Sequence, residues 1–109
     1  MIKFGIYQKQ ALVWSDTSSE NAELPAGYRL ENALAPNDKF GRQVLFEPLG
    51  IAFTEQGNAY VSTRTSGVWK ITDNYWQQFV EGIFDSLGVV VDSESTIVVG
   101  EKTGLTRLV

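Results

Sequence analysis

Short hydrophobic runs separated by polar turns recur along this chain. The runs are rich in Val, Ile and aromatic residues, and Gly, Asn, Asp, Ser or Pro punctuates the gaps between them. They cover residues 2–7, 11–14, 43–46, 51–53, 59–61 and 68–71. Runs of this length and composition are typical of β-strands, so the pattern predicts an all-β fold built from antiparallel strands.

The N-terminal part has the less regular pattern. Only residues 8–10, which are polar, separate the first two runs, and this predicts a tight hairpin at the start of the chain. Residues 15–27 are mostly polar and are expected to form a surface loop. The run at 43–46 is predicted to be a strand that ends before Pro48.

One stretch fits two kinds of element. Trp76, Phe79, Val80 and Ile83 recur at helical spacing, whereas residues 75–80 are also rich in the aromatic side chains that favour strands. Between these alternatives we favour a strand.

The C-terminal half repeats itself at an offset of 38 residues. Residues 49–54 match residues 87–92, and residues 59–61 match residues 97–99. With one residue deleted, the match continues from 67–71 onto 104–108. Each copy is predicted to be an antiparallel meander that cannot bury both faces alone and therefore stacks against its neighbour.

The repeated segments carry a family resemblance. Residues 48–53, 57–62 and 67–71 together resemble one blade of the NHL-repeat and gluconolactonase-like β-propellers, and residues 87–109 resemble a second blade. Asp92 keeps an acidic position of that pattern, whereas Thr54 replaces it in the first copy. The resemblance covers about 60 of the 109 residues. It implies a blade-like fold, and no metal ligand of that family can be matched here residue by residue.

The expected organisation is a single domain over residues 1–109. It comprises an N-terminal hairpin and loop region at 1–47, a first repeat at 48–85 and a second at 86–109. Propellers use about four to eight blades, so two blades are expected to be completed by a homo-oligomer in which strand edges pair between subunits. A small monomeric β-sandwich or barrel, whose end strands pair with each other, is the alternative.

Composition restricts the chemistry. The chain has neither cysteine nor histidine, which excludes disulfides, thiolate nucleophiles and the Ser-His and Cys-His catalytic arrangements. Thirteen acidic residues against nine basic ones give a net charge of −4 without a basic cluster, which argues against nucleic acid as a partner. No apolar run approaches the roughly 20 residues that span a bilayer, and no signal peptide is recognisable, so a cytoplasmic location is expected.

The candidate binding residues belong to two groups. Arg64-Thr65 and Lys102-Thr103 occupy the same hairpin position in the two repeats, and a cation beside a hydroxyl suits an anionic ligand or an acidic partner. Solvent-exposed turns that serve solubility are the alternative for these four residues.

Aromatic residues form the second group. Tyr75 and Trp76 are candidates for stacking on a sugar or anchoring a protein interface, with Trp76 expected to be exposed because polar Asn74, Gln77 and Gln78 surround it. Packing in the core is the alternative reading of both side chains. Asp85, Asp92, Glu94 and Glu101 offer oxygen ligands, but they match no established cation loop, so neither a metal nor a cofactor is predicted.

These observations favour a non-enzymatic binding or interaction module that engages a protein or a carbohydrate through exposed aromatics and repeated hairpin turns. A small lactonase-like, metal-dependent hydrolase is one alternative, which the missing histidines weaken. An accessory protein that blocks or bridges another macromolecule is the other.

Overall fold

The computed structural model describes residues 3–4, 9–20, 23–37, 41–42, 45–101 and 104–109. The elements are β1 (Lys3–Phe4), β2 (Gln10–Ala11), β3 (Trp14–Asp16), the 3-10 turn η1 (Ser18–Glu20), β4 (Glu31–Ala33), β5 (Pro48–Phe53), β6 (Ala59–Thr63), β7 (Val68–Thr72), β8 (Tyr75–Glu81), β9 (Val89–Ser93), β10 (Thr96–Glu101) and β11 (Gly104–Leu108). Every strand pair is antiparallel, so the predicted all-β fold is confirmed. The described strands form no closed barrel. Among the described residues, no helix is long and apolar enough to cross a membrane.

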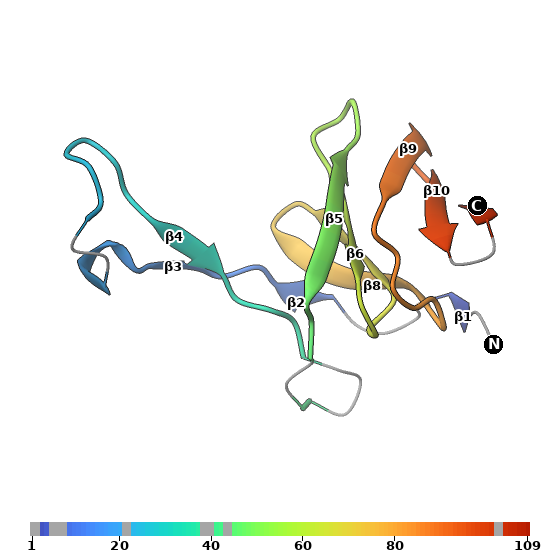
Figure 1. The fold of residues 1–109 in the computed structure, drawn as a ribbon, viewed down its shortest axis with the longest axis horizontal. Helices are drawn as coiled ribbons and strands as arrows, with labels where there is room; N and C mark the ends of the chain where they lie inside the picture. Colours follow the sequence, from blue (N-terminus) through green and yellow to red (C-terminus); the bar gives the residue numbers. More distant parts are fainter. Residues whose placement is uncertain (1–2, 5–8, 21–22, 38–40, 43–44, 102–103) are drawn as a thin grey trace.

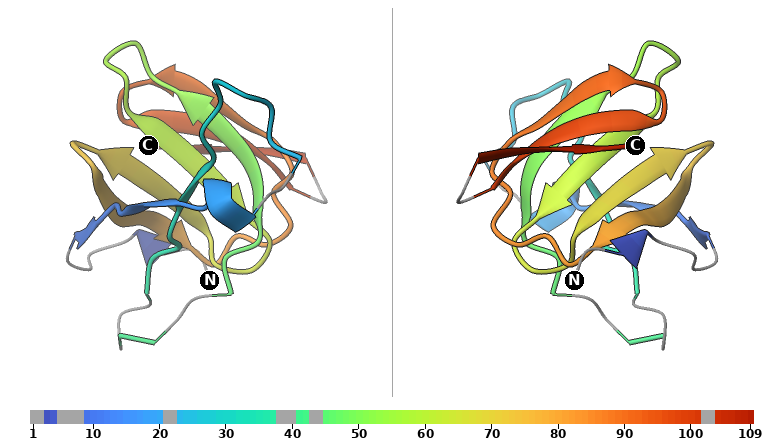
Figure 2. Two further views of the ribbon diagram at one scale, coloured as in Figure 1. Left: turned by 90° about the vertical axis from the view of Figure 1, so that its left-hand side faces the viewer. Right: turned by 90° about the vertical axis from the view of Figure 1, so that its right-hand side faces the viewer.

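Two meanders make up the body of the molecule. The first meander, β5–β8, forms a sheet in the order β8-β7-β6-β5, and the second meander, β9–β11, forms the sheet β11-β10-β9. The two sheets lie against each other, with β9 beside β5 and β6 (Figures 1 and 2). The third sheet, β3 with β4, projects away from this body along the longest axis as an arm (Figure 1).

Strand pairing in the two meanders follows the 38-residue offset. Ile51 pairs with Val61 in the first meander, and Val89, 38 residues later, pairs with Val99 in the second. On the other side of the central strand, Val61 pairs with Trp69 and Val99 with Thr106, which accommodates the one-residue deletion. The sequence repeat is therefore also a repeat of register.

Local turn chemistry explains why these strands turn where they do. Gly57 adopts a φ of 86° in the β5–β6 turn, where Asn58 N–H donates to the hydroxyl oxygen of Thr54, Oγ1, at 3.1 Å. Asp73 and Asn74 both have positive φ, at 52° and 64°, which is the conformation that a two-residue hairpin between twisted strands requires. This turn directs residues 75–81 back along β7, so the expected strand at 75–80 is confirmed.

Alternation along the strands gives each meander two faces. The front face of the first meander carries Ala52, Tyr60, Val68 and Lys70, and its back face carries Ile51, Phe53, Ala59, Val61, Trp69 and Ile71. By the same register, the front face of the second meander carries Val90, Val98, Leu105 and Arg107, and its back face carries Val89, Val91, Ile97, Val99, Thr106 and Leu108.

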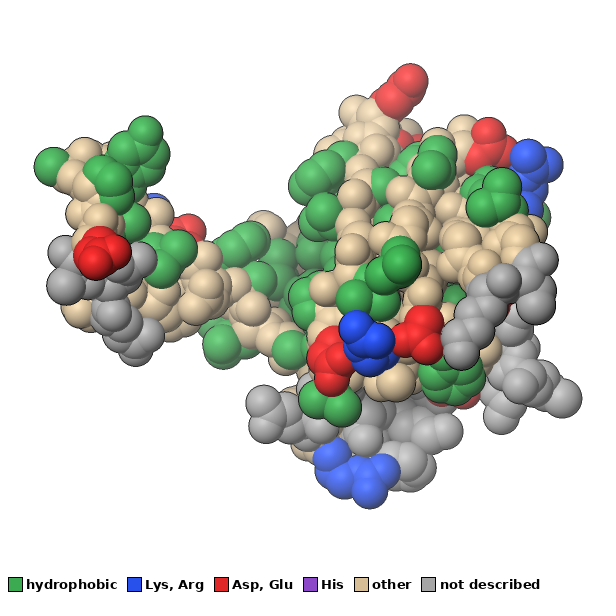
Figure 3. Space-filling view, in the orientation of Figure 1, with side chains coloured by type: hydrophobic (Ala, Val, Ile, Leu, Met, Phe, Trp, Pro, Cys, Tyr) green, Lys and Arg blue, Asp and Glu red, His purple; other side chains and the backbone are tan. Residues whose placement is uncertain are grey.

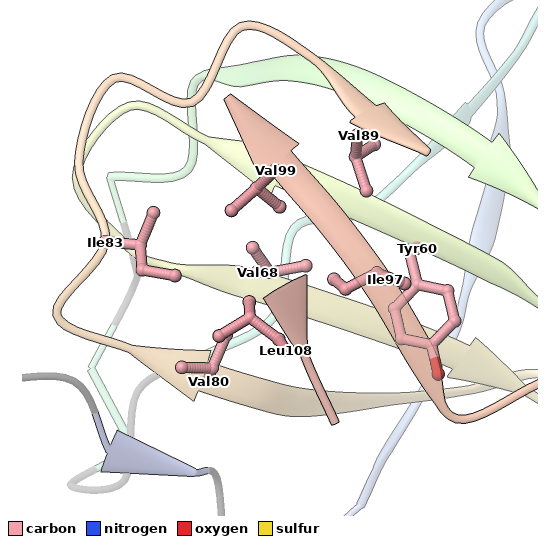
Figure 4. Packing of buried hydrophobic residues seen from close by; sticks show 8 residues of the cluster. All are labelled: Tyr60, Val68, Val80, Ile83, Val89, Ile97, Val99 and Leu108. Atoms are coloured by element: carbon pink, nitrogen blue, oxygen red, sulfur yellow. The ribbon is translucent and has the colours of Figure 1, made fainter. Parts of the chain in front are cut away.

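The main hydrophobic cluster lies between the two sheets. It joins the front face of the first meander to the back face of the second, as the side chains in Figure 4 show. Its buried members are Tyr60, Val68, Val80, Ile83, Val89, Ile97, Val99 and Leu108. A second cluster of Val61, Trp69 and Trp76 lies on the opposite side of the first sheet, covered in part by Leu12 and Phe46. The first sheet is thus buried on its front face and over part of its back face, where β5 stays open, whereas the second sheet is buried on one face.

Three predictions for the N-terminal part and the chain ends are wrong. β1 and β2 do not form a hairpin with each other, because both pair with β8, and Trp14 pairs with Ala33 in the arm. Of the strand predicted at 43–46, Leu45 and Phe46 are not in a strand, and residues 43–44 lie outside the described residues. The end strands do not pair with each other either, since β11 pairs with β10.

Candidate functional site

Arg64 is held inside a small ion-pair network. Its Nε lies 2.8 Å from Glu47 Oε2 and its Nη1 lies 3.1 Å from Asp85 Oδ1, and all three side chains are partly exposed. Backbone hydrogen bonds join the same residues, because Arg64 N–H donates to the Glu47 carbonyl and Asp85 N–H to the Arg64 carbonyl. An anionic ligand at Arg64 would have to displace two carboxylates.

Both acidic partners of Arg64 have a left-handed backbone. Glu47 has a φ of 42° and Asp85 a φ of 53°, values that side chains other than Gly, Asn and Asp seldom adopt. The guanidinium therefore connects the segment before β5 with the segment after β8. This arrangement favours a structural role for Arg64 over ligand binding.

Of the other residues of the predicted basic rim, the structure describes only Thr65. Thr65 is exposed in the turn that follows Arg64. Lys102 and Thr103, their counterparts in the second repeat, lie outside the described residues. The predicted repetition of a basic and a hydroxyl group therefore stays a prediction.

The expected exposure of Trp76 is wrong. Its side chain is only 4% exposed and packs against Val61, Trp69 and the ring of Phe46, whose centroid is 5.2 Å away. Its indole Nε1–H donates to the Leu34 carbonyl at 3.0 Å, so its polar atom is satisfied as well. Polar neighbours in sequence misled the prediction, because alternation places Gln77 on the opposite face of the strand. Trp76 is a core residue.

Tyr75 remains accessible. It lies at the first position of β8, paired with Ala11 and Thr72, and its ring is exposed. Because Trp76 is buried, Tyr75 is the one of the two aromatic candidates that is exposed. A lone exposed tyrosine is common on protein surfaces and defines no site by itself.

The arm carries five exposed apolar side chains that belong to neither core cluster. Trp14 is 56% exposed and Tyr28 is 72% exposed. Val13, Leu30 and Leu34 on the same arm are exposed as well, and Figure 3 shows hydrophobic side chains at its far end. Exposed apolar side chains of this size that gather on one element make that element a candidate interaction surface.

Polar contacts keep the arm in shape. Ser18 N–H donates to Asp16 Oδ1 at 2.9 Å, and Leu30 N–H donates to Ser18 Oγ at 2.8 Å across the arm. The hydrogen bonds from Ser18, together with the nearby charge of Arg29, hold the pKa of Asp16 below its ordinary value. Arg29 also pairs with Glu31 at 2.7 Å on the exposed surface. These contacts fix the arm's local geometry without covering its apolar side chains.

The second meander exposes its front face. Val90 is 65% exposed and Leu105 is 81% exposed, although they correspond by register to Ala52 and Val68, which face the core. Beside them lies a cavity of about 480 Å³ lined by Arg64, Asp85, Leu87, Gly88, Gly100 and Glu101. This face is a second candidate surface.

Glu94 connects the two meanders at their turns. Gln56 N–H donates to its Oε1 at 3.0 Å, and Asn58 Nδ2 donates to its Oε2 at 3.2 Å. Desolvation raises the pKa of Glu94, but these hydrogen bonds, one from Thr54 and the charge of Lys70 outweigh it, so that the net shift is downward. The charge of Glu94 is therefore used to join the sheets.

Carboxylates also line a second cavity, of about 420 Å³, which is bounded by Phe53, Glu55, Val91, Asp92, Ser93 and Glu94. Within the described residues no three acidic side chains are arranged to hold a metal ion. Among the described residues, the candidate sites are therefore the exposed apolar side chains of the arm and those on the front face of the second meander. No family model, curated protein or solved structure matches the chain.

Sequence reasoning missed both surfaces for different reasons. Trp14 was assigned to a hairpin with residues 2–7, so its place on a projecting arm was not foreseen. The exposure of Val90 and Leu105 could have been inferred from the repeat. It places both residues on one face of the second meander, and the sequence contains no third meander to cover that face. That inference requires the register between β9, β10 and β11, which is known only from the strand pairing in the structure.

Proposed function

We propose that this chain is a non-enzymatic protein-binding module whose arm, residues 13–20 and 23–34, is the contact element. The observation that carries the proposal is the group of five exposed apolar side chains on the arm, which includes Trp14 and Tyr28. Tryptophan and tyrosine are the residues that most often anchor protein interfaces, because they bury a large area at a small entropic cost.

The structure of the arm supports a partner of protein size. A ribbon of two strands is marginally stable alone, and three pairs in register join β3 to β4: Trp14 with Ala33, Ser15 with Asn32 and Asp16 with Glu31. A protein that packed on the arm would cover its apolar side chains and stabilise it. The exposed Asp16, Arg29 and Glu31 would lie at the rim of such a contact, where charged groups are common.

The other expected functions have less support. Of the two aromatic residues predicted to stack on a sugar or anchor a protein, Trp76 is buried and Tyr75 is exposed. Hydrolysis would require free acid and base groups, whereas Glu47, Asp85 and Glu94 are each engaged in contacts between structural elements. Blocking or bridging another macromolecule is compatible with an arm that binds protein. The proposal therefore includes an accessory protein that acts in this way.

Site-specific photocrosslinking tests the proposal. A benzophenone amino acid placed at position 28 is expected to form an adduct with one protein in cells of the source organism, whereas the same group at position 45 is not. Leu45 is a suitable control because it is also exposed but lies outside the arm. The adduct is identified by mass spectrometry, and the captured protein is then purified.

A titration with that purified protein decides the matter. Wild type is expected to bind it in a fixed stoichiometry, and the double variant Trp14→Ser, Tyr28→Ser roughly 30-fold or more weakly. Leu45→Ser should bind as wild type does. Equal binding by all three proteins would overturn the proposal. So would saturable binding on a glycan array that is lost with Tyr75→Ala and kept by the arm variant, because it would assign the site to a carbohydrate.

A further inference from the structure

The contact between the two meanders is directional. The front face of the first meander packs on the back face of the second, although the two meanders have the same register. The internal contact uses one front face and one back face. The front face of the second meander and the back face of the first meander take no part in it. The chain thus leaves open the front face of the second meander and, along β5, part of the back face of the first.

A close backbone approach gives the internal contact its shape. A Cβ atom on Gly50 would lie 2.9 Å from the Leu87 carbonyl oxygen and 3.0 Å from Ser62 Oγ, so glycine is what allows residue 87 to reach the first sheet. The counterparts of Gly50 and Ser62 in the second meander are Gly88 and Gly100. A Cβ on either of these glycines would meet no atom within 4 Å, and both line the 480 Å³ cavity. The place that Leu87 fills on the first meander is open on the second.

The first meander carries the matching segment. Leu49 corresponds to Leu87, and it enters β5 as Leu87 leads into β9. Ile51 and Phe53 on the back face of β5 are 56% and 68% exposed, whereas their counterparts Val89 and Val91 are packed into the main cluster. Leu12 and Phe46 cover the part of the back face near Trp69 and Trp76, so the accessible part is the first strand, β5.

A polar contact has a counterpart as well. In the internal interface Lys70 Nζ donates to the Glu94 carbonyl at 3.1 Å. Arg107 corresponds to Lys70 and is exposed, and Gln56 corresponds to Glu94. Stacking of another meander in the same way would place the Gln56 carbonyl where Arg107 can donate to it.

We propose that the front face of the second meander binds β5 of a second copy of this chain. Val90 and Leu105 form the apolar part of the acceptor surface, and Gly88 admits the backbone of Leu49 of the second copy. The internal interface between the two meanders is the template for this contact. Because two different surfaces meet, the assembly is head to tail, and it grows into a closed ring or an open chain rather than stopping at a symmetric dimer. The arm takes no part in this contact, so the inference is independent of the proposed function.

Two single variants and their mixture test the inference by light scattering. Wild type is expected to show a mass that rises with concentration to a multiple of 12.1 kDa. Val90→Glu blocks the acceptor surface and Phe53→Glu blocks the donor strand, and each variant alone should be monomeric. Mixed together, they should form a 1:1 dimer and nothing larger, because one intact acceptor and one intact donor remain. Tyr28→Glu, on the arm, should assemble as wild type does.

A glycine variant separates assembly from folding. Gly88→Ala places a methyl group where the monomer has open space, so circular dichroism and thermal unfolding should match wild type while the assembly weakens at least tenfold. A wild-type protein that stays monomeric up to millimolar concentration would overturn the inference. Two other results would do the same: a variant mixture that stays monomeric, and full assembly by Gly88→Ala.

Discussion

The hydroxyl of Tyr60 donates a 2.6 Å hydrogen bond to the backbone carbonyl of Glu94. Tyr60 lies in the middle of the first meander with its side chain fully buried, and Glu94 lies in the turn that connects β9 to β10. The ring of Tyr60 is also in edge-to-face contact with Phe79, with centroids 5.1 Å apart, and Lys70 Nζ lies 5.3 Å from its centroid. One side chain thus connects the apolar cluster with the polar contacts that align the two sheets.

Replacement of Tyr60 by phenylalanine removes that hydroxyl and leaves the ring in place. We expect Tyr60→Phe to lower the free energy of unfolding by about 1 kcal/mol, which is typical of a single hydrogen bond between neutral groups. The Glu94 carbonyl keeps its hydrogen bond from Lys70 in this variant, so the loss should not be larger. Urea unfolding followed by tryptophan fluorescence measures the change, and a stability equal to that of wild type would show that the bond contributes nothing.

Acid should weaken the contact that Glu94 makes. Because its pKa is lower in the folded protein than its ordinary value of 4.5, the unfolded chain binds more protons just below that pH. The stabilisation is therefore fully present above pH 4.5 and is lost as the pH falls through the lowered pKa. Thermal unfolding between pH 7 and pH 2.5 should show a smaller acid-induced loss for Glu94→Gln than for wild type. Part of the loss should persist in the variant, since Asp16 shifts in the same direction.

Two glycines with the same kind of backbone should respond differently to alanine. Gly67 has a φ of 75°, and a Cβ atom there would lie 2.1 Å from the Val80 carbonyl oxygen. Gly57 has a φ of 86°, but its Cβ would meet no atom within 4 Å. We expect Gly57→Ala to cost about 1 kcal/mol from backbone strain, and Gly67→Ala to cost several times more or to prevent folding. Soluble yield and melting temperature compare the two, and similar melting temperatures would contradict the expected collision with Val80.

The two tryptophans with contrasting environments provide the test of the core. Trp76→Ala removes a buried ring and leaves the Leu34 carbonyl without its donor, so we expect a loss of about 3–5 kcal/mol. Trp14→Ala, on the arm, should change the stability of the body by less than about 0.5 kcal/mol. Guanidinium unfolding of both variants measures this difference. A mild effect at Trp76 would mean that its ring is accessible, as the sequence pattern had suggested.

The predictions that succeeded concern residues close together in the sequence. The strands around Gly57, Asp73 and Gly67 follow from turn residues that adopt positive φ, and a hairpin needs only its own turn and the alternation of its two strands. Asp73-Asn74 also held the signal that decides between helix and strand for residues 75–80, since two consecutive left-handed residues close a hairpin and end a helix.

The predictions that failed depend on residues far apart in the sequence. Residues 3–4 and 10–11 have the composition of strands, but nothing local shows that β8 rather than a neighbouring run is their partner. The burial of Trp76 likewise depends on Phe46 and Leu12, which reach it from the N-terminal part. The candidate surfaces share this limit, because exposure of Trp14 or Val90 is a property of what fails to cover them.

The pairing of β1 and β2 with β8 has a consequence for the order of folding. Lys3 pairs with Glu81 and Gln10 with Trp76, whereas partners within a meander, such as Phe53 and Ala59, are only a few residues apart. Contacts between residues that are distant in sequence have a larger entropic cost of loop closure, and they form more slowly than local contacts. During synthesis, moreover, β1 and β2 leave the ribosome long before β8 exists. β1 and β2, which are made before β8, are therefore the last of these strands to enter the sheet, and until then they offer unpaired backbone to a chaperone or a neighbouring chain.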